Sequence, residues 1–213
     1  MAAHINKPKL SNLIQKFLYY QQSNDPNASD SDVSISTLPT FTKKLSMHSS
    51  ASSVYFAPSN PCGIHGLHQE QIQSTWQWWQ GPPQQDTVLV NMGNRGDMWL
   101  PMSGFVVACV LFFFSFTYGW KIYSVALVWW YILSEDSGGR DKVTGMWLVE
   151  CKYCNRQPLL QVVHVDTILH AVHLLPYFRH KHISQAITQD NSLDKYPIYY
   201  VNRFVDHHSF EIL

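Results

Sequence analysis

Residues 105–132, FVVACVLFFFSFTYGWKIYSVALVWWYI, decide the fold. Residues 106–116 are rich in valine and phenylalanine, and residues 122–132 are again β-branched and aromatic. Such residues favour extended backbone, and the segment between them, 118–121, contains the glycine that a tight turn prefers. The pattern therefore predicts a β-hairpin. Because each strand is apolar almost without interruption, we expect the hairpin to be buried on both faces.

The same region supports a second interpretation, a membrane-spanning helix. Residues 98–120 carry neither a charge nor a histidine, and Trp99, Tyr118 and Trp120 could lie at the two membrane interfaces. A spanning helix needs about 20 mostly apolar residues. Proline, glycine and hydroxyl residues reduce the strongly apolar part to 105–114, a length closer to that of a buried strand. We favour the hairpin and keep a single-pass span near 98–120 as the alternative.

The composition of the whole chain excludes several classes of protein. The chain has 213 residues with 15 basic and 15 acidic side chains, so a strongly basic protein that coats DNA is excluded, although a local basic patch is not. Four cysteines in a chain of this length do not make a disulfide framework and are read as reduced, intracellular thiols. The N-terminal residues contain no apolar stretch that would predict a signal peptide.

The first 37 residues predict a helix followed by a linker. Apolar residues recur at helical spacing after the candidate cap Ser11: Leu10, Leu13, Ile14, Phe17 and Leu18. Residues 21–37 are polar and contain too little apolar surface to order themselves. We therefore divide the chain into an N-terminal helix with a partly disordered linker, 1–37, and a β-rich domain, 38–213.

Shorter elements follow along the β-rich part. Strands are predicted at 54–56, 86–91, 145–150 and 159–165, the last two as a pair. Helices are predicted in the glutamine-rich stretch from Leu67, over 167–178, and near the C-terminus, where one side would carry Tyr200, Val201, Phe204, Val205 and His208. The expected fold class is α+β, a small curled antiparallel β-sheet or partial barrel with short flanking helices at both ends.

Cysteine and histidine supply the candidates for a metal site. Cys151 and Cys154 have the CxxC spacing, but a structural zinc site needs four ligands, which His164, His170 and His173 would have to complete. On a helix, His170 and His173 would share one face. We prefer the interpretation that the cysteines flank a hairpin turn. No metal and no cofactor is predicted, and Cys151, Cys154, His170 and His173 stay as weak candidates.

Other polar clusters point to no specific chemistry. Asp206, His207 and His208 are adjacent on a predicted helix, where successive side chains point about 100° apart and do not converge on one ion. The chain contains no nucleophile elbow, phosphate-binding loop or metalloprotease motif, so we expect a protein that is not an enzyme. The basic clusters at 43–44 and 179–181 are typical of an ordinary solvated surface.

Several motifs occur in a fixed order along the chain. They are LPTF at 38–41, YFAPS at 55–59, DTVLVN at 86–91, FFSF at 113–116, ALVWW at 126–130, TGMW at 144–147, and the C-terminal runs 163–176 and 200–211. In this order they resemble the tail of fungal Plavaka-type transposase proteins, which belong with the Kyakuja–Dileera–Zisupton and CACTA-like DNA transposons. The resemblance extends from about Leu38 to the end of the chain.

The resemblance has limited implications for function. In such proteins the acidic triad of an RNase H-like core lies upstream of this tail, so no catalytic residue is carried over. The resemblance implies a detached, non-catalytic C-terminal module, located inside the cell or in its nucleus, with DNA, protein or the missing upstream core as its partner. Membrane location belongs to the alternative. Cys109, Val125 and the segment CKYC at 151–154 depart from the family pattern and make the chain more apolar.

Overall fold

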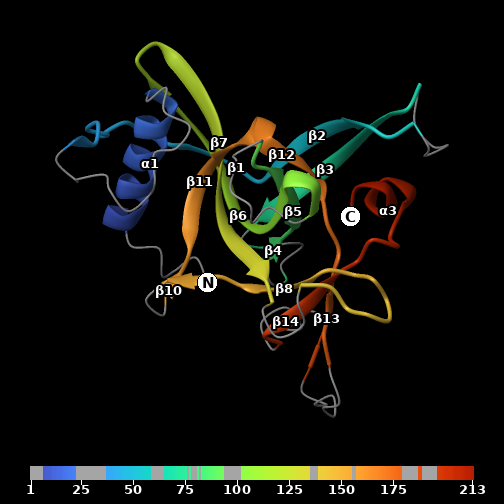
Figure 1. Cartoon of the computed structure of the whole chain (residues 1–213). Helices are drawn as coiled ribbons and strands as arrows, with labels where there is room; N and C mark the ends of the chain where they lie inside the picture. Colours follow the sequence, from blue (N-terminus) through green and yellow to red (C-terminus); the bar gives the residue numbers. More distant parts are fainter. Residues whose placement is uncertain are drawn as a thin grey trace.

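The computed structural model describes residues 7–22, 37–58, 65–75, 77, 81, 83–93, 102–134, 139–154, 157–178, 187–188 and 196–213. These residues are mostly β-structure, arranged as a curled antiparallel half-barrel with a short helix towards each end of the chain (Figure 1). The predicted fold class is therefore confirmed.

The predicted hairpin forms the centre of the main sheet. β6 (Phe105–Tyr118) pairs antiparallel with β7 (Lys121–Leu133), starting at the turn with Tyr118 opposite Lys121. The register shifts between Val110 and Phe112, which places a bulge in β6 and bends it. The hairpin prediction is confirmed, and its strands are buried along most of their length as expected.

Shorter strands flank the hairpin on both sides. The order of the main sheet is β12-β5-β6-β7-β8-β14-β13, with β1 added to β6 and β11 added to β7. Along its outer edge, β6 pairs with β1 near the turn and with β5 further from it, and β7 likewise pairs with β11 nearer the turn and with β8 at its far end. The two partners on each side diverge, and the sheet curls. The bounds of these strands are β1 (Ser46–His48), β5 (Thr87–Asn91), β8 (Leu148–Cys151), β11 (Leu160–His164), β12 (Ile168–Ala171), β13 (Leu174–Pro176) and β14 (Ile198–Val201).

The helical alternative for residues 98–120 is not what the structure shows. A 3-10 turn, Met102–Gly104, leads directly into β6, and β6 runs to Tyr118. Among the helices in the described ranges, none has the length and apolar character needed to cross a membrane.

A second sheet corrects the prediction of a glutamine-rich helix. Its strands are β2 (Ser50–Phe56), β3 (Leu67–Thr75) and β4 (Gln84–Gln85), in that order. Along β3, exposure alternates with period two, so Gln69 and Gln71 point outwards while Glu70 and Ile72 point inwards. Glutamine favours helix, but intrinsic propensities differ by only a fraction of a kcal/mol per residue, and pairing with β2 over seven residue pairs outweighs them. The strand predicted at 54–56 is confirmed as the end of β2.

The N-terminal helix is confirmed as α1 (Lys7–Gln22). Ile14, Phe17 and Leu18 are buried against the hairpin, which is the apolar stripe that the sequence predicted. Ser11 lies inside the helix and is not its cap, because the helix begins at Lys7.

The C-terminal third contains the largest corrections. The predicted strands at 145–150 and 159–165 exist as β8 and β11, but they do not pair with each other, because both pair with β7. Residues 167–178 do not form a helix. They contain the end of a 3-10 turn (Val165–Thr167), β12 and β13, since strand pairing with β5 and β14 buries their apolar side chains better than a short isolated helix would. The predicted C-terminal helix is split into β14 and α3 (His207–Ile212).

A short two-stranded ribbon follows β8 along the chain. β9 (Tyr153–Cys154) pairs with β10 (Gln157–Pro158) directly after β8. The expectation that Cys151 and Cys154 flank a hairpin turn is wrong, because Cys151 ends β8 and Cys154 lies in the strand that follows it. The core lies on both faces of β6 and β7, with α1 covering one face and β2, β3 and β12 covering the other.

Candidate nucleic-acid interface

The tip of the β6–β7 hairpin presents a tryptophan to solvent. Gly119 and Trp120 have φ angles of 53° and 68°, the two positive values that a two-residue hairpin turn requires. Glycine adopts this conformation freely, whereas a bulky side chain there is strained by about 1–2 kcal/mol. Trp120 is nevertheless fully exposed, with 102% relative accessibility. A strained and unburied aromatic residue at a protruding tip contributes nothing to the core and is typical of a binding position.

Two lysines from a distant part of the sequence lie on the segment that leads into β1, along the turn half of β6. β1 pairs with β6 from Ser46↔Ser115 to His48↔Phe113, so the chain that precedes Ser46 runs along β6 towards the turn. The ring of Phe41 contacts that of Phe116 at 5.0 Å, which fixes the other end of this segment against β6. Lys43 and Lys44 lie between these two points, and both are exposed.

A third lysine completes the basic surface. Lys121 directly follows Trp120, is exposed, and places its Nζ 5.0 Å from the ring centroid of Tyr123. That cation–π contact orients the ammonium group along the hairpin without removing it from water. We call Lys43, Lys44, Trp120 and Lys121 the tip surface. In Figure 1 the hairpin end projects beyond the sheet next to α1, away from α3.

Charge is distributed unevenly over the fold. The segments that build this end of the molecule, residues 7–22, 37–49 and 105–133, contain six lysines and neither aspartate nor glutamate. The lysines are Lys7, Lys9, Lys16, Lys43, Lys44 and Lys121. The neighbouring strand β11 ends in a turn where His164 Nδ1 lies 3.2 Å from the carboxylate of Asp166. Within these three segments lysine is therefore not balanced by acidic side chains, an arrangement that favours anions locally.

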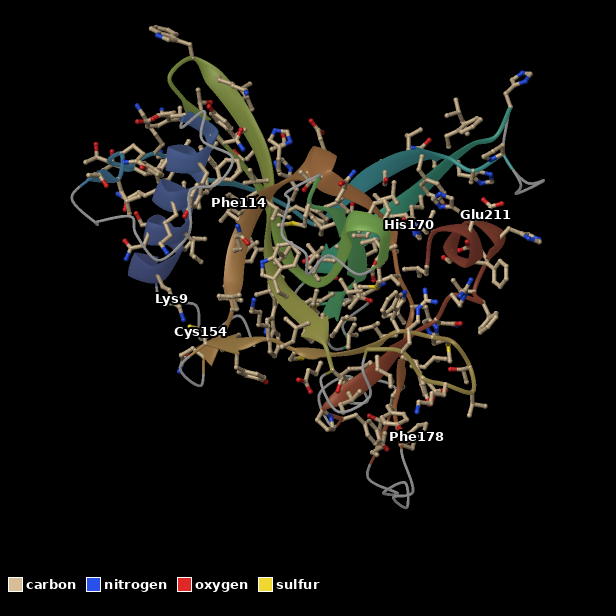
Figure 2. The ribbon with its side chains drawn as sticks, in the orientation of Figure 1. Lys9, Phe114, Cys154, His170, Phe178 and Glu211 are labelled. Atoms are coloured by element: carbon tan, nitrogen blue, oxygen red, sulfur yellow. The ribbon has the colours of Figure 1, made fainter. Side chains whose placement is uncertain are left out.

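A pocket opens below α1, on the same side of the sheet. Its volume is about 380 Å³, and it lies between α1, the end of β5 and strands β10 and β11. Lys9, Lys16 and Cys154 are at its rim, and Leu13 and Leu160 are among its apolar lining residues. Figure 2 shows Lys9 and Cys154 close together at the lower end of α1. The pocket extends the basic side of the molecule but is separate from the hairpin tip.

Cys151 and Cys154 lie in different strands and in different surroundings. Cys151 ends β8 opposite Tyr131, whereas Cys154 lies in β9 and is exposed. Burial, and to a smaller extent the neighbouring Cys109 and Cys151, raise the pKa of Tyr131 far above its ordinary value. No group of three or more His, Cys, Asp or Glu side chains within the described ranges is placed to hold a metal ion.

The candidate histidines are separated by the strand structure. His170 is buried in β12, and His173 follows the strand and approaches Asn202, with 3.2 Å between Nδ1 and Nδ2. They do not share a helix face, because residues 167–178 are not helical. His164 lies at the end of β11 and bonds the backbone N–H of Asp166.

The cluster Asp206–His208 has three separate roles, as the spacing predicted. The Asp206 carboxylate caps α3 by accepting from the Ser209 backbone N–H at 2.7 Å, while His207 is exposed and His208 is buried. The basic cluster at 179–181 lies outside the described residues.

Sequence reasoning missed two features of this interface. It treated Lys43 and Lys44 as an ordinary surface pair, because nothing in residues 37–48 reveals pairing with a strand 70 residues away. It also read Trp120 only as part of the turn or of a membrane interface. The usable signal was the turn itself, since Gly–Trp is an unfavourable pair for a tight hairpin.

Comparison of the chain with protein-family profiles, with curated proteins and with solved structures gives no match.

Proposed function

We propose that this chain is a non-catalytic module that binds single-stranded nucleic acid through the tip surface of the β6–β7 hairpin. The observation that carries the proposal is the fully exposed Trp120 at the hairpin tip, next to Lys121, with the exposed Lys43 and Lys44 on the segment that packs along the turn half of β6. The resemblance to transposase tails favours the same class of partner, with DNA as the expected nucleic acid.

The chemistry of the tip surface supports this partner. A nucleic acid strand offers phosphates at regular spacing, and each lysine that contacts one releases condensed counterions. A flat aromatic ring beside the lysines can stack on an unpaired base, which contributes about 1–3 kcal/mol per base and tolerates any sequence. The bases of a duplex are already stacked, so Trp120 should discriminate in favour of single strands.

The test measures affinity against salt concentration. Fluorescence anisotropy of a labelled 20-nucleotide single strand is titrated with the full chain between about 50 and 300 mM salt. Three lysine–phosphate contacts predict a slope of about −2 for log affinity against log salt. A duplex of the same sequence should bind more weakly, because it presents no free base to Trp120.

Matched variants assign the binding to the tip surface. Lys43→Gln combined with Lys44→Gln should make the slope less steep, from about −2 to about −0.7, since two of the three phosphate contacts are lost. Trp120→Ala should weaken single-strand binding by about tenfold or more and leave the slope unchanged. Lys142→Gln, an exposed lysine in a turn outside the tip surface, is the control. A flat salt dependence, or equal loss with the control, refutes the proposal.

A further inference from the structure

Four aromatic rings from four elements meet on the opposite side of the molecule. Tyr55 of β2 stacks on His208 of α3 at 4.8 Å and on His68 of β3 at 5.8 Å, and lies 5.1 Å from His170 of β12. The rings of His170 and His208 are 5.0 Å apart. Figure 2 shows His170 between the sheet and the C-terminal helix. We call these four residues the histidine stack.

The histidine stack contains buried nitrogen atoms that lack hydrogen-bond partners. His170 is 1% exposed and His208 is 7% exposed. The ring Nδ1 of His170 donates to the Ala171 carbonyl, so in the neutral ring Nε2 carries a lone pair, and no partner faces it. His208 Nδ1 and His68 Nε2 are also buried without a partner. An unsatisfied buried nitrogen is costly, and it is the atom at which a proton can be added.

The charged groups around the histidine stack come from each element packed on it. β3 supplies Glu70, whose carboxylate accepts from the Ala171 backbone N–H. Asp206 lies directly before α3, and Glu211 lies within α3. Asp86, which precedes β5, raises the pKa of Glu70. The surrounding carboxylates favour protonated imidazole, whereas burial opposes it.

For the two most buried histidines, His170 and His208, burial affects the ring pKa more than the nearby carboxylates do. Desolvation lowers the pKa of His170, and the neighbouring His208 lowers it further, although Asp206 acts in the other direction. Desolvation likewise lowers the pKa of His208 against the pull of Asp206 and Glu211. The state in which α3 packs on β2, β3 and β12 (the docked state) therefore favours neutral histidine rings. The stabilisation of the docked state is complete above the ordinary imidazole pKa and is lost as the pH falls below that pKa.

Glu70 changes the stability of the docked state in the opposite direction as the pH falls. Desolvation raises its pKa, while its bond to the Ala171 backbone lowers it, and the result is a carboxyl that favours the protonated form more than usual. Its contribution to docking therefore increases on acidification. The ordinary pKa of a glutamate carboxyl lies about two units below that of imidazole, so the histidines respond first as the pH falls from neutral.

The histidine stack holds one end of α3 while the other end has separate anchors. The backbone oxygen of Leu213 accepts from Trp147 Nε1 and from Arg140 Nη2, both at 2.9 Å. These bonds contain no group that titrates near neutral pH. Loss of the histidine contacts would release the first turn of α3 and leave Leu213 attached.

We propose that the histidine stack is a proton-operated latch, which keeps α3 on the β2–β3 arm at neutral pH and releases it when His170 and His208 take up protons. Linkage sets the size of the response. Uptake of one proton on opening changes the opening equilibrium about tenfold per pH unit, and uptake of two changes it about a hundredfold. Nucleic-acid binding at the hairpin tip is not required for this device.

The experiment is hydrogen exchange of the full chain, followed by mass spectrometry of the C-terminal peptides at pH 7.5 and pH 5.5. After correction for the intrinsic pH dependence of exchange, peptides covering 204–210 should open about tenfold or more between the two conditions, whereas peptides from β6 and β7 should not change. In parallel, proton NMR of the histidine rings should give titration midpoints for His170 and His208 below about 6.5.

Three variants separate the latch from general acid unfolding. His208→Phe keeps an aromatic ring on Tyr55 but cannot be protonated, so the pH response of α3 should be largely lost. Glu70→Gln keeps an acceptor for the Ala171 N–H and removes the opposing carboxyl, so the response should grow. His207→Phe, which changes the exposed neighbour, is the matched control and should leave the wild-type response.

Several results would overturn the latch. They are unchanged exchange of 204–210 between pH 7.5 and pH 5.5, an undiminished response in His208→Phe, and midpoints at or above about 6.5 for both buried rings. Saturable uptake of Zn²⁺ by the full chain, abolished by His208→Phe, would likewise show that the unpartnered nitrogens serve a metal and not a proton. The NMR midpoints are measured on the wild-type chain, so they decide the question even if a variant does not fold.

Discussion

Phe17→Ala tests whether α1 is part of the folded domain. The Phe17 side chain is buried, and its ring makes edge-on contacts with Tyr123 at 5.9 Å and Phe116 at 6.5 Å. Truncating a buried phenylalanine to alanine typically costs about 3–5 kcal/mol, of which each aromatic pair accounts for about 0.5–1.5 kcal/mol. We therefore expect the free energy of unfolding to fall by about 3–4 kcal/mol.

The assay is urea denaturation of the full chain, followed by far-ultraviolet circular dichroism, with a thermal melt as a second readout. For a chain of this size, a loss of about 3–4 kcal/mol corresponds to a melting temperature lower by about 10 °C. Asn12→Ala is the matched control, because Asn12 is an exposed position in the same helix and alanine favours helix. A loss of less than about 1 kcal/mol for Phe17→Ala, or a loss equal to the control, would mean that α1 does not contribute to the core.

Three further predictions concern single sites. Trp120→Gly should raise the free energy of unfolding by about 0.5–1 kcal/mol in the same urea assay, because glycine relieves the positive φ of the turn, and it should weaken nucleic-acid binding at the same time. Tyr199→Phe should lower stability by about 1 kcal/mol, since the buried hydroxyl donates to the Tyr196 carbonyl, and an unchanged urea midpoint would contradict this. The hydrogen bonds that Thr144 donates lower the pKa of Asp141. The contribution of Asp141 to stability is therefore complete above about pH 4 and is lost as the pH falls through the lowered pKa. In thermal melts recorded from pH 6 to pH 2, Asp141→Asn should remove the part of the stability loss at low pH that comes from this group.

Local sequence pattern was sufficient to predict the elements whose own residues show what is buried. The β6–β7 hairpin needs only two extended runs and a turn, and all three are visible in residues 105–132. α1 shows its buried stripe at helical spacing because a single helix face determines what is buried. β5 and the end of β2 are short β-branched or aromatic runs between turn residues, and these too were predicted correctly.

The errors share one physical cause. The stretch from Leu67 is rich in glutamine, which favours helix, and the segment 167–178 has apolar residues at helical spacing, but local propensity differs between helix and strand by only fractions of a kcal/mol per residue. Pairing with β2 and β5 decides both cases, because it satisfies the backbone and buries one face. The partners of β8 and β11 were misassigned for the same reason, since both strands are suited to an edge of β7 and only the curl of the sheet separates them.

The sequence by itself determined that the chain is β-rich, that its core is built on residues 105–132, and that an amphipathic helix packs near its start. Those properties depend on burial of apolar side chains, which is recorded in local periodicity. Tertiary structure alone brought the segment that carries Lys43 and Lys44 to the turn half of β6, and Tyr55 to His170 and His208. Both sites join residues from distant segments through strand register and helix docking, and no periodicity in one segment encodes its distance from another.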